Sequence, residues 1–144
     1  MSARDADVAE TANELRLAVG LLVRRVRAES PFPVGQLAVL GVLDREGPQT
    51  TTQLAAAQLV RHQSMARTVA QLVELGWVRT EPHPSDGRKT QLSLTDAGRE
   101  QLRFVRGRRE DWLAGRILAE LTPAERRTLA ESASLIARLA GPER

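Results

Sequence analysis

The apolar positions near the start of the chain recur at alternating steps of four and three residues. They are Val8, Ala12, Leu15, Val19, Leu22 and Val26. This spacing predicts a helix over residues 5–28 with a narrow apolar seam that packs on another helix. Leu17, Leu21 and Val23 lie outside the seam and give the helix more apolar surface than one face needs. We therefore expect this helix to meet a partner chain as well as its own core.

Two shorter helical patterns follow. Residues 34–46 carry leucines at helical spacing, and a Gly-Pro pair ends the pattern. Thr50 and Gln53 then fit a capping box, in which two side chains bond to backbone N–H groups at the start of a helix. We expect Leu54 and Leu59 to be the buried positions of this third helix. The turn after it contains no glycine, so it is predicted from the pattern alone.

Residues 62–75 are predicted to form a fourth helix with two different faces. Its apolar face consists of Met65, Val69, Leu72 and Val73. Its polar face consists of Gln63, Ser64, Arg67, Thr68 and Gln71. Gly76 is well placed to end the helix. An apolar back and a polar front, directly after another short helix, are typical of a helix-turn-helix whose second helix enters the major groove of DNA.

After Gly76 the apolar period changes from helical spacing to alternation. Residues 77–81 and 90–94 are predicted strands, and residues 82–89 form a turn-rich loop with a basic tip. The segment is therefore a β-hairpin that directly follows the helix pair. We expect this hairpin to be a wing that gives DNA a second contact.

Two helices complete the chain. Thr95 caps a long helix that runs to about Ala119, and Thr122-Pro123 with Glu125 marks the start of the last helix. We expect the last helix to bury four apolar residues, which are Leu129, Leu135, Ile136 and Leu139. The order of elements predicts a mainly α fold with a small β-wing, in a single domain over residues 1–144.

Composition adds little that is specific to DNA. The chain has 144 residues, of which 42% are apolar and 27% are charged, a balance that suits one globular domain with a hydrophobic core. A net charge of +3 is weak support for a nucleic-acid partner. Residues 50–100 carry six basic and five acidic side chains. The prediction of DNA binding therefore depends on where the charges lie and not on their sum.

The sequence also excludes several classes of protein. Cysteine is absent, which excludes disulfides, thiolate metal sites and thiol redox switches. The acidic N-terminus does not fit a secretory signal, and no apolar run approaches the ~20 residues of a membrane span. These features indicate a cytoplasmic protein. No Gly-rich phosphate loop or nucleotide fingerprint occurs, so we expect no cofactor.

Three groups of side chains are candidate DNA contacts. The recognition-helix group, which offers amides to adenine and a guanidinium to guanine, is His62, Gln63, Ser64, Arg67, Thr68 and Gln71. The helix-start group, whose hydroxyls suit a phosphate, is Thr50, Thr51 and Thr52. The wing group is Asp86, Arg88 and Lys89. We expect Arg88 and Lys89 to reach the adjacent minor groove or its phosphates, and Asp86 to hold the Arg88 guanidinium in a bidentate pair.

Several of these positions also belong to a pattern of motifs. The motifs are Leu54-Ala55, Met65-Ala66-Arg67, Leu72, Leu75-Gly76-Trp77-Val78, Pro84-Ser85-Asp86-Gly87-Arg88 and Leu94-Thr95-Asp96-Ala97-Gly98. They resemble the multiple-antibiotic-resistance regulator (MarR) family, over residues 53–98 in motif and over nearly the whole chain in element order. The resemblance implies a winged helix-turn-helix over residues 34–98 and a homodimer joined through helices at 5–30 and 112–140.

The same resemblance implies a transcriptional repressor. Such a protein binds double-stranded DNA at a pseudo-palindromic operator and is often released by a small, frequently phenolic ligand. The candidate ligand-binding residues here are Phe32, Arg106 and Trp112, with Arg106 suited to an anionic effector. The chain contains no tyrosine, so few aromatic side chains are available to line a cleft that binds its ligand by stacking.

Other classes of function find less support in the residues. His83, Ser85 and Asp86 invite comparison with a hydrolase, but they lie in one short loop and no nucleophile elbow is present. The chain has two histidines and no cysteine, which does not indicate a metal site. The alternative is a winged-helix protein-interaction module that binds no DNA. The polar face of residues 63–71 argues against it, because an interaction helix carries apolar anchors there.

Overall fold

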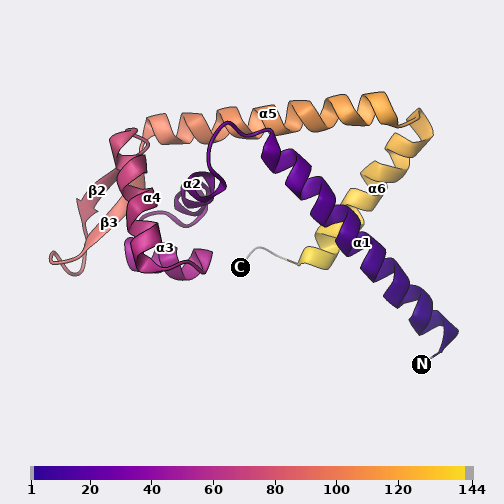
Figure 1. The fold of residues 1–144 in the computed structure, drawn as a ribbon, viewed down its shortest axis with the longest axis horizontal. Coiled ribbons are helices and arrows are strands. Elements are labelled where there is room, and N and C mark those ends of the chain that lie inside the picture. Colours follow the sequence, from indigo (N-terminus) through magenta and orange to yellow (C-terminus); the bar gives the residue numbers. More distant parts are fainter. Residues whose placement is uncertain (1, 142–144) are drawn as a thin grey trace. The chain divides into compact units, whose positions relative to one another are not determined.

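The computed structural model describes residues 2–141 (Figure 1). Its elements are α1 (Ala3–Ala28), α2 (Val34–Glu46), β1 (Gln49–Thr50), α3 (Thr51–Gln58), α4 (His62–Glu74), β2 (Val78–Pro82), β3 (Thr90–Leu94), α5 (Asp96–Glu120) and α6 (Pro123–Ala140). The chain divides into two compact units, Met1–Arg109 and Glu110–Arg144, with the boundary inside α5. None of the described helices is both long and apolar enough to cross a membrane. The predicted order of helices and hairpin is confirmed.

Capping residues define where the helices begin. The Thr50 hydroxyl accepts a hydrogen bond from the Gln53 backbone N–H at 3.1 Å, and the Gln53 side chain accepts one from the Thr50 N–H at 2.9 Å. Thr122 and Glu125 form the same reciprocal pair at the start of α6. Both predicted capping boxes are thus confirmed. They satisfy backbone donors that the first turn of a helix would otherwise leave unpaired.

The hydrophobic core of the N-terminal unit lies between α2, α3, α4, the sheet and the first half of α5. Its fully buried side chains are Leu40, Leu54, Leu72, Leu92, Val39, Val78 and Val105. Leu54 is buried as predicted, whereas the prediction for Leu59 is wrong, because that side chain is 93% exposed. Val73 is also more exposed than predicted, at 39%. At 3.6 residues per turn it lies about 80° around α4 from Met65, at the edge of the buried face.

The sheet has three antiparallel strands in the order β1-β3-β2. Val78 pairs with Leu94 at one end of the hairpin and Pro82 with Thr90 at the other, so the predicted hairpin is confirmed. The sequence pattern missed β1, which pairs Gln49 with Leu92. Two residues are too few to show a period, and β1 forms because the chain passes the outer edge of β3 before α3 begins.

The first turn of α5 lies against the chain that leaves α4. The Thr95 hydroxyl donates to the Gly76 carbonyl at 2.6 Å and accepts from the Gly98 N–H at 3.0 Å. A Cβ atom added at Gly98 would overlap the carbonyl oxygen of Trp77 and lie 2.9 Å from a methyl carbon of Leu94. Only glycine therefore allows α5 to approach the hairpin this closely.

Two helices carry many apolar side chains that are exposed in the described part of the chain. Within the described part of the chain, neither α1 nor α6 contains a buried residue. The four residues that the last helix was predicted to bury are exposed in the single chain, where Leu129, Leu135, Ile136 and Leu139 are 38%, 55%, 36% and 75% exposed. On α1, exposed apolar side chains include Val8, Leu17, Leu21 and Leu22.

The turn between α3 and α4 contains an unusual backbone conformation. Leu59 has φ 55° and ψ 41°, and in the described part of the chain no other non-glycine residue has a positive φ. Leu59 and Val60 donate their N–H groups to carbonyls of Ala55 and Ala56 and so close the end of α3. The left-handed region costs an ordinary residue roughly 1–2 kcal/mol, because Cβ approaches the following carbonyl. Leucine thus occupies a position that suits glycine.

We expect Leu59→Gly to raise the free energy of unfolding by about 1 kcal/mol, because glycine adopts this conformation without steric strain. Urea denaturation at fixed protein concentration measures the change. Leu75→Gly is the matched control: this leucine is also exposed and also ends a helix, but with φ −70°. There the substitution lowers stability by up to about 1 kcal/mol. Equal losses at both positions would contradict the assignment of strain to Leu59.

Candidate nucleic-acid interface

A surface hollow of about 500 Å³ joins the beginning of α3, the beginning of α4 and the hairpin. Its lining residues are Thr50, Thr51, Thr52, Gln53, His62, Ala66, His83, Lys89 and Thr90. The fold thus brings together the three predicted helix-start threonines, one predicted residue of α4 and one of the wing. His83 and Gln53 line the same hollow, although the sequence did not mark them as DNA contacts.

The start of α3 faces this hollow with hydroxyl and backbone donors. Thr50 uses its hydroxyl to cap the helix, so of the three helix-start threonines that line the hollow, Thr51 and Thr52 are the ones whose hydroxyls do not form this cap. The first N–H groups of a helix have no partner inside the helix, and the helix dipole favours an anion at this end. Together these groups are suited to a phosphate oxygen.

The outer face of α4 is polar, as the sequence predicted. Met65, Val69 and Leu72 are buried. At 3.6 residues per turn, Gln63 and Arg67 lie about 160° around the helix from Met65, on its opposite side. Both side chains are exposed, and so are those of His62 and Ser64. This geometry presents one amide and one guanidinium outward from the first half of the helix.

Two predicted recognition-helix residues already have partners in the chain. The Thr68 hydroxyl donates to the Ser64 carbonyl at 3.2 Å. The Gln71 carbonyl oxygen accepts a hydrogen bond from the Gln36 side-chain amide at 3.2 Å, and Gln36 is only 9% exposed. Adenine recognition by glutamine uses the carbonyl and the amide together. The bond from Gln36 uses one of the two lone pairs of the Gln71 carbonyl and ties this side chain to α2.

Gln36 is a residue that the sequence analysis missed. It is a polar side chain on an otherwise buried stretch of α2, and a buried amide needs a hydrogen-bond partner. The lone glutamine within an apolar helix was the available signal. Its partner could not be read from the pattern, because Gln71 lies 35 positions further along the chain.

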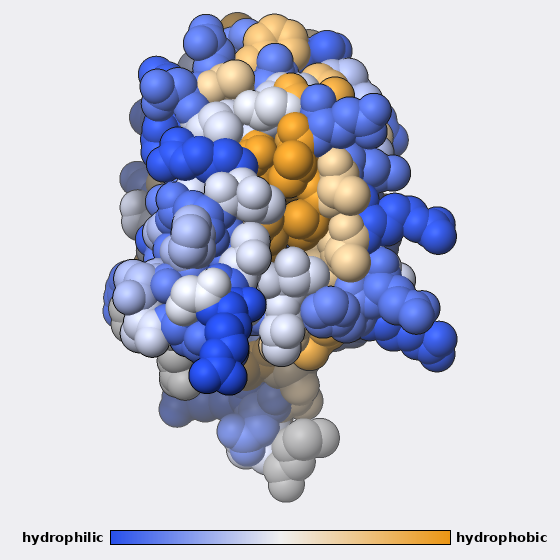
Figure 2. Space-filling model, turned by 90° about the vertical axis from the view of Figure 1, so that its left-hand side faces the viewer, coloured by the Kyte–Doolittle hydropathy of each residue, from blue (hydrophilic) through white to orange (hydrophobic). Residues whose placement is uncertain are grey.

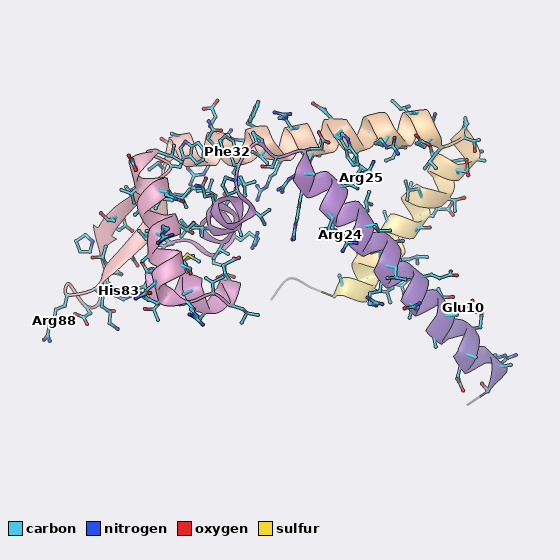
Figure 3. The ribbon with its side chains drawn as sticks, in the orientation of Figure 1. Glu10, Arg24, Arg25, Phe32, His83 and Arg88 are labelled. Carbon is cyan, nitrogen blue, oxygen red and sulfur yellow. The ribbon has the colours of Figure 1, made fainter. Side chains whose placement is uncertain are left out.

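The tip of the wing is held by backbone hydrogen bonds. The Asp86 carboxylate accepts from the Arg88 backbone N–H at 3.1 Å, and the Asp86 carbonyl accepts from the Lys89 N–H at 3.0 Å. The predicted pairing of Asp86 with the Arg88 guanidinium is wrong, since the ion pairs found among residues 2–141 do not include it. An aspartate bonds readily to the backbone two residues on, which orders the turn. Arg88 thus extends from the tip without an ionic partner (Figure 3).

The base of the wing is held by a carboxylate that bridges the strands. Glu81 accepts hydrogen bonds from the Ser93 hydroxyl at 2.7 Å and from the Gln91 amide at 3.0 Å, and Arg79 lies 3.7 Å away. The hydrogen bond from Ser93 is the main reason that the pKa of Glu81 is below its usual value, because it stabilises the charged form. This contact across the hairpin fixes the direction in which the wing projects.

The geometry of the wing loop does not support hydrolysis. The Ser85 hydroxyl lies 3.1 Å from Nδ1 of His83, so these two side chains do meet. The same nitrogen also accepts from the Ser85 backbone N–H, and the Asp86 carboxylate bonds to Arg88 instead of orienting the histidine. In residues 2–141 no group of His, Cys, Asp and Glu side chains could hold a metal ion.

Two of the three predicted ligand-binding residues contact other residues of the N-terminal unit. The Phe32 ring packs edge-on against Trp77 with ring centroids 4.9 Å apart, and the Arg106 guanidinium lies 3.2 Å from the Asp44 carboxylate. Burial is the main cause of a lowered pKa at the neighbouring Arg109, and the charges of Arg27 and Arg106 add to it. Trp112 is half-buried in the C-terminal unit.

The face that carries the hairpin is mainly hydrophilic but includes a compact apolar area (Figure 2). The exposed large apolar side chains of α4 and its C-terminal turn are Val73 and Leu75. Both lie at the opposite end of α4 from Gln63, and no large apolar side chain of the first half of α4 is exposed. The first half of the helix therefore lacks the apolar anchors that an interaction helix would need.

Comparisons with known proteins agree with this geometry. A model of the MarR family matches residues 30–89. A helix-turn-helix transcriptional regulator of Mycobacterium tuberculosis is 40% identical over 89% of this chain and 91% of its own length. A transcriptional repressor of Pseudomonas putida is 25% identical over 56% of this chain and 48% of its own length. A solved transcriptional regulator of Pseudomonas aeruginosa is 35% identical, covers 99% of this chain and 100% of its own, and has a TM-score of 0.79.

Proposed function

Because the chain belongs to the MarR family of DNA-binding transcriptional regulators, and is not an enzyme, we propose that it is a repressor that binds a pseudo-palindromic operator as a homodimer. The observation that carries the proposal is the convergence of α3, α4 and the wing on one surface hollow, which threonine, histidine and lysine side chains line. On this proposal, Gln63 and Arg67 contact base edges in the major groove. Thr51, Thr52 and His62 contact the phosphates beside it.

The unpartnered faces of α1 and α6 support the homodimer. Their exposed leucines and valines would be costly to leave in water over such a length of helix. A two-fold dimer covers the same surface on both copies, and we assign this role to residues 5–30 and 112–140. The winged helix-turn-helix, residues 34–98, then occurs twice. The two copies enter successive major grooves, about 34 Å apart, on one side of the duplex.

Repression is the expected result when the protein occupies a promoter. A dimer that spans two successive major grooves competes with the transcription machinery wherever its operator overlaps a promoter. The repressor of Pseudomonas putida among the relatives supports repression. Binding as a homodimer, and not as a monomer, is what makes the site two-fold symmetric.

We further propose that a small phenolic or anionic effector lowers operator affinity through Phe32, Arg106 and Trp112. An anion would compete with Asp44 for the Arg106 guanidinium, next to the unbalanced charges of Arg27 and Arg109. Such an effector regulates only by favouring one geometry of the dimer over the other. The effect on operator affinity of a panel of phenolic and anionic compounds tests this part.

Selection of bound sequences from random duplex DNA tests the main proposal, with sedimentation of the same protein at micromolar concentration. We expect a dimer, an enriched inverted repeat and a footprint on each half-site. A monomer without an enriched sequence would overturn the proposal. A dimer that binds all duplexes equally would leave DNA binding intact but refute an operator.

Replacement of Arg88 by alanine tests the wing. If each Arg88 contacts a phosphate, Arg88→Ala weakens operator binding, and the slope of log affinity against log salt becomes shallower by about 0.9 per half-site. Arg88→Lys is the matched control, because it keeps the charge and therefore most of the slope. Filter binding between 50 and 200 mM salt, a range over which such contacts change affinity strongly, measures both. Unchanged affinity and slope in Arg88→Ala would exclude a phosphate contact.

A further inference from the structure

The turn between α3 and α4 exposes two apolar side chains next to the recognition helix. Leu59 is 93% exposed, the highest value among the exposed large apolar residues of the described chain, and Val60 is 45% exposed. The backbone of the turn is fixed by hydrogen bonds to the last turn of α3. Leu59 therefore stands in solvent in a strained conformation, and no packing within its own chain compensates for either cost.

Leu59 lies at the opposite end of α3 from the proposed phosphate contacts Thr51 and Thr52. From Thr51 to Leu59 the chain advances eight residues, which is about 12 Å of helix rise. The major groove is also about 12 Å wide. With Thr51 and Thr52 at the phosphates on one side of the groove, an α3 that crosses the groove at an angle covers less than its width, so Leu59 lies over the base edges and short of the opposite phosphates. Leu59 also precedes His62, the first residue of α4, by only three positions.

We propose that Leu59 is a specificity-determining residue that contacts the C5-methyl group of a thymine at the edge of each half-site. Thymine is the base that presents an apolar group in the major groove, and an exposed leucine has no hydrogen-bonding group to offer any other base. This contact lies outside the polar set of α4 and adds an apolar preference to it. The inference rests on the proposed operator binding.

Deoxyuridine scanning tests the proposal, because uracil differs from thymine only by the missing methyl group. Each thymine of the selected operator is replaced in turn, and affinity is measured for the wild-type protein and for Leu59→Asn. Asparagine tolerates the left-handed conformation, so this variant keeps the backbone and removes the apolar contact. Leu59→Met is the matched control, since it keeps an apolar side chain of similar length.

We expect one deoxyuridine position per half-site to weaken wild-type binding roughly fourfold, the effect of one buried methyl group. The same replacement has no effect on Leu59→Asn, whereas Leu59→Met retains the loss. Equal losses for wild type and Leu59→Asn at every position would overturn the thymine contact. An unchanged DNA affinity with an altered oligomeric state in Leu59→Asn would show instead that the turn binds a second copy of the chain. Failure of the wild type to select any operator is a different result, because it refutes the proposed function itself.

Discussion

Replacement of Gly98 by alanine is expected to lower the free energy of unfolding by about 2–3 kcal/mol. The added methyl group would overlap the backbone carbonyl of Trp77, which lies directly before β2, and a backbone carbonyl cannot move aside as the end of a flexible side chain can. Relief requires α5 to shift away from Leu94 and from the Thr95 hydrogen bonds. Overpacking of this kind typically costs 1–3 kcal/mol. Urea denaturation gives the change.

Gly107→Ala provides the matched control for this prediction. Gly107 lies in the same helix, but nothing stands within 4 Å of the position that its Cβ would take. Alanine should therefore stabilise α5 there by about 0.5–1 kcal/mol, because it has the higher helix propensity. Both variants are compared at one protein concentration, because the stability of a dimer depends on it. A stabilised Gly98→Ala would show that the hairpin adapts and that close approach is not required.

Replacement of Arg67 by alanine is expected to weaken operator binding by about 2 kcal/mol per half-site. For a symmetric dimer this amounts to about 4 kcal/mol, or about three powers of ten in affinity. Arg67 is exposed on the side of α4 opposite Met65. When α4 lies in the major groove, the guanidinium on this side can form two hydrogen bonds to one guanine. We also expect the preference for guanine to be lost at one position per half-site in sequences selected by the variant.

Arg99→Ala is the control for Arg67→Ala, since it removes the same charge from an exposed ion pair with Asp96 at the start of α5. It should change affinity only slightly, through the overall charge. A loss in Arg67→Ala that is equal for all duplex sequences would assign Arg67 to a phosphate instead of a base. A loss no larger than that of Arg99→Ala would remove Arg67 from the interface.

Much of the fold could be predicted from local patterns. The capping boxes at Thr50 and Thr122 set the start of two helices, and alternation over residues 90–94 predicted β3 with its observed bounds. These signals work because helix caps and strand periods depend on neighbours within a few positions. The prediction for Leu59 failed for the same reason. Its apolar character suggested burial, but the turn placed it in solvent.

The candidate site was predictable only in part. Sequence pattern identified the outward residues Gln63 and Arg67, because they alternate with buried positions along one helix. It did not identify the pairing of Gln36 with Gln71 or the role of Asp86 in the loop backbone. The first depends on how α2 packs on α4, and the second on the shape of one turn.

The sequence by itself determined the order of the helices, the hairpin and the polar front of α4, since each follows from the spacing of residues along a continuous stretch of chain. Only the tertiary structure decided that Thr51, His62, His83 and Lys89 share one hollow, that Gln71 bonds to Gln36, and that Leu59 faces solvent. Those properties depend on packing between segments far apart in the chain. A periodic pattern records which face of an element is apolar, but not which other element lies against it.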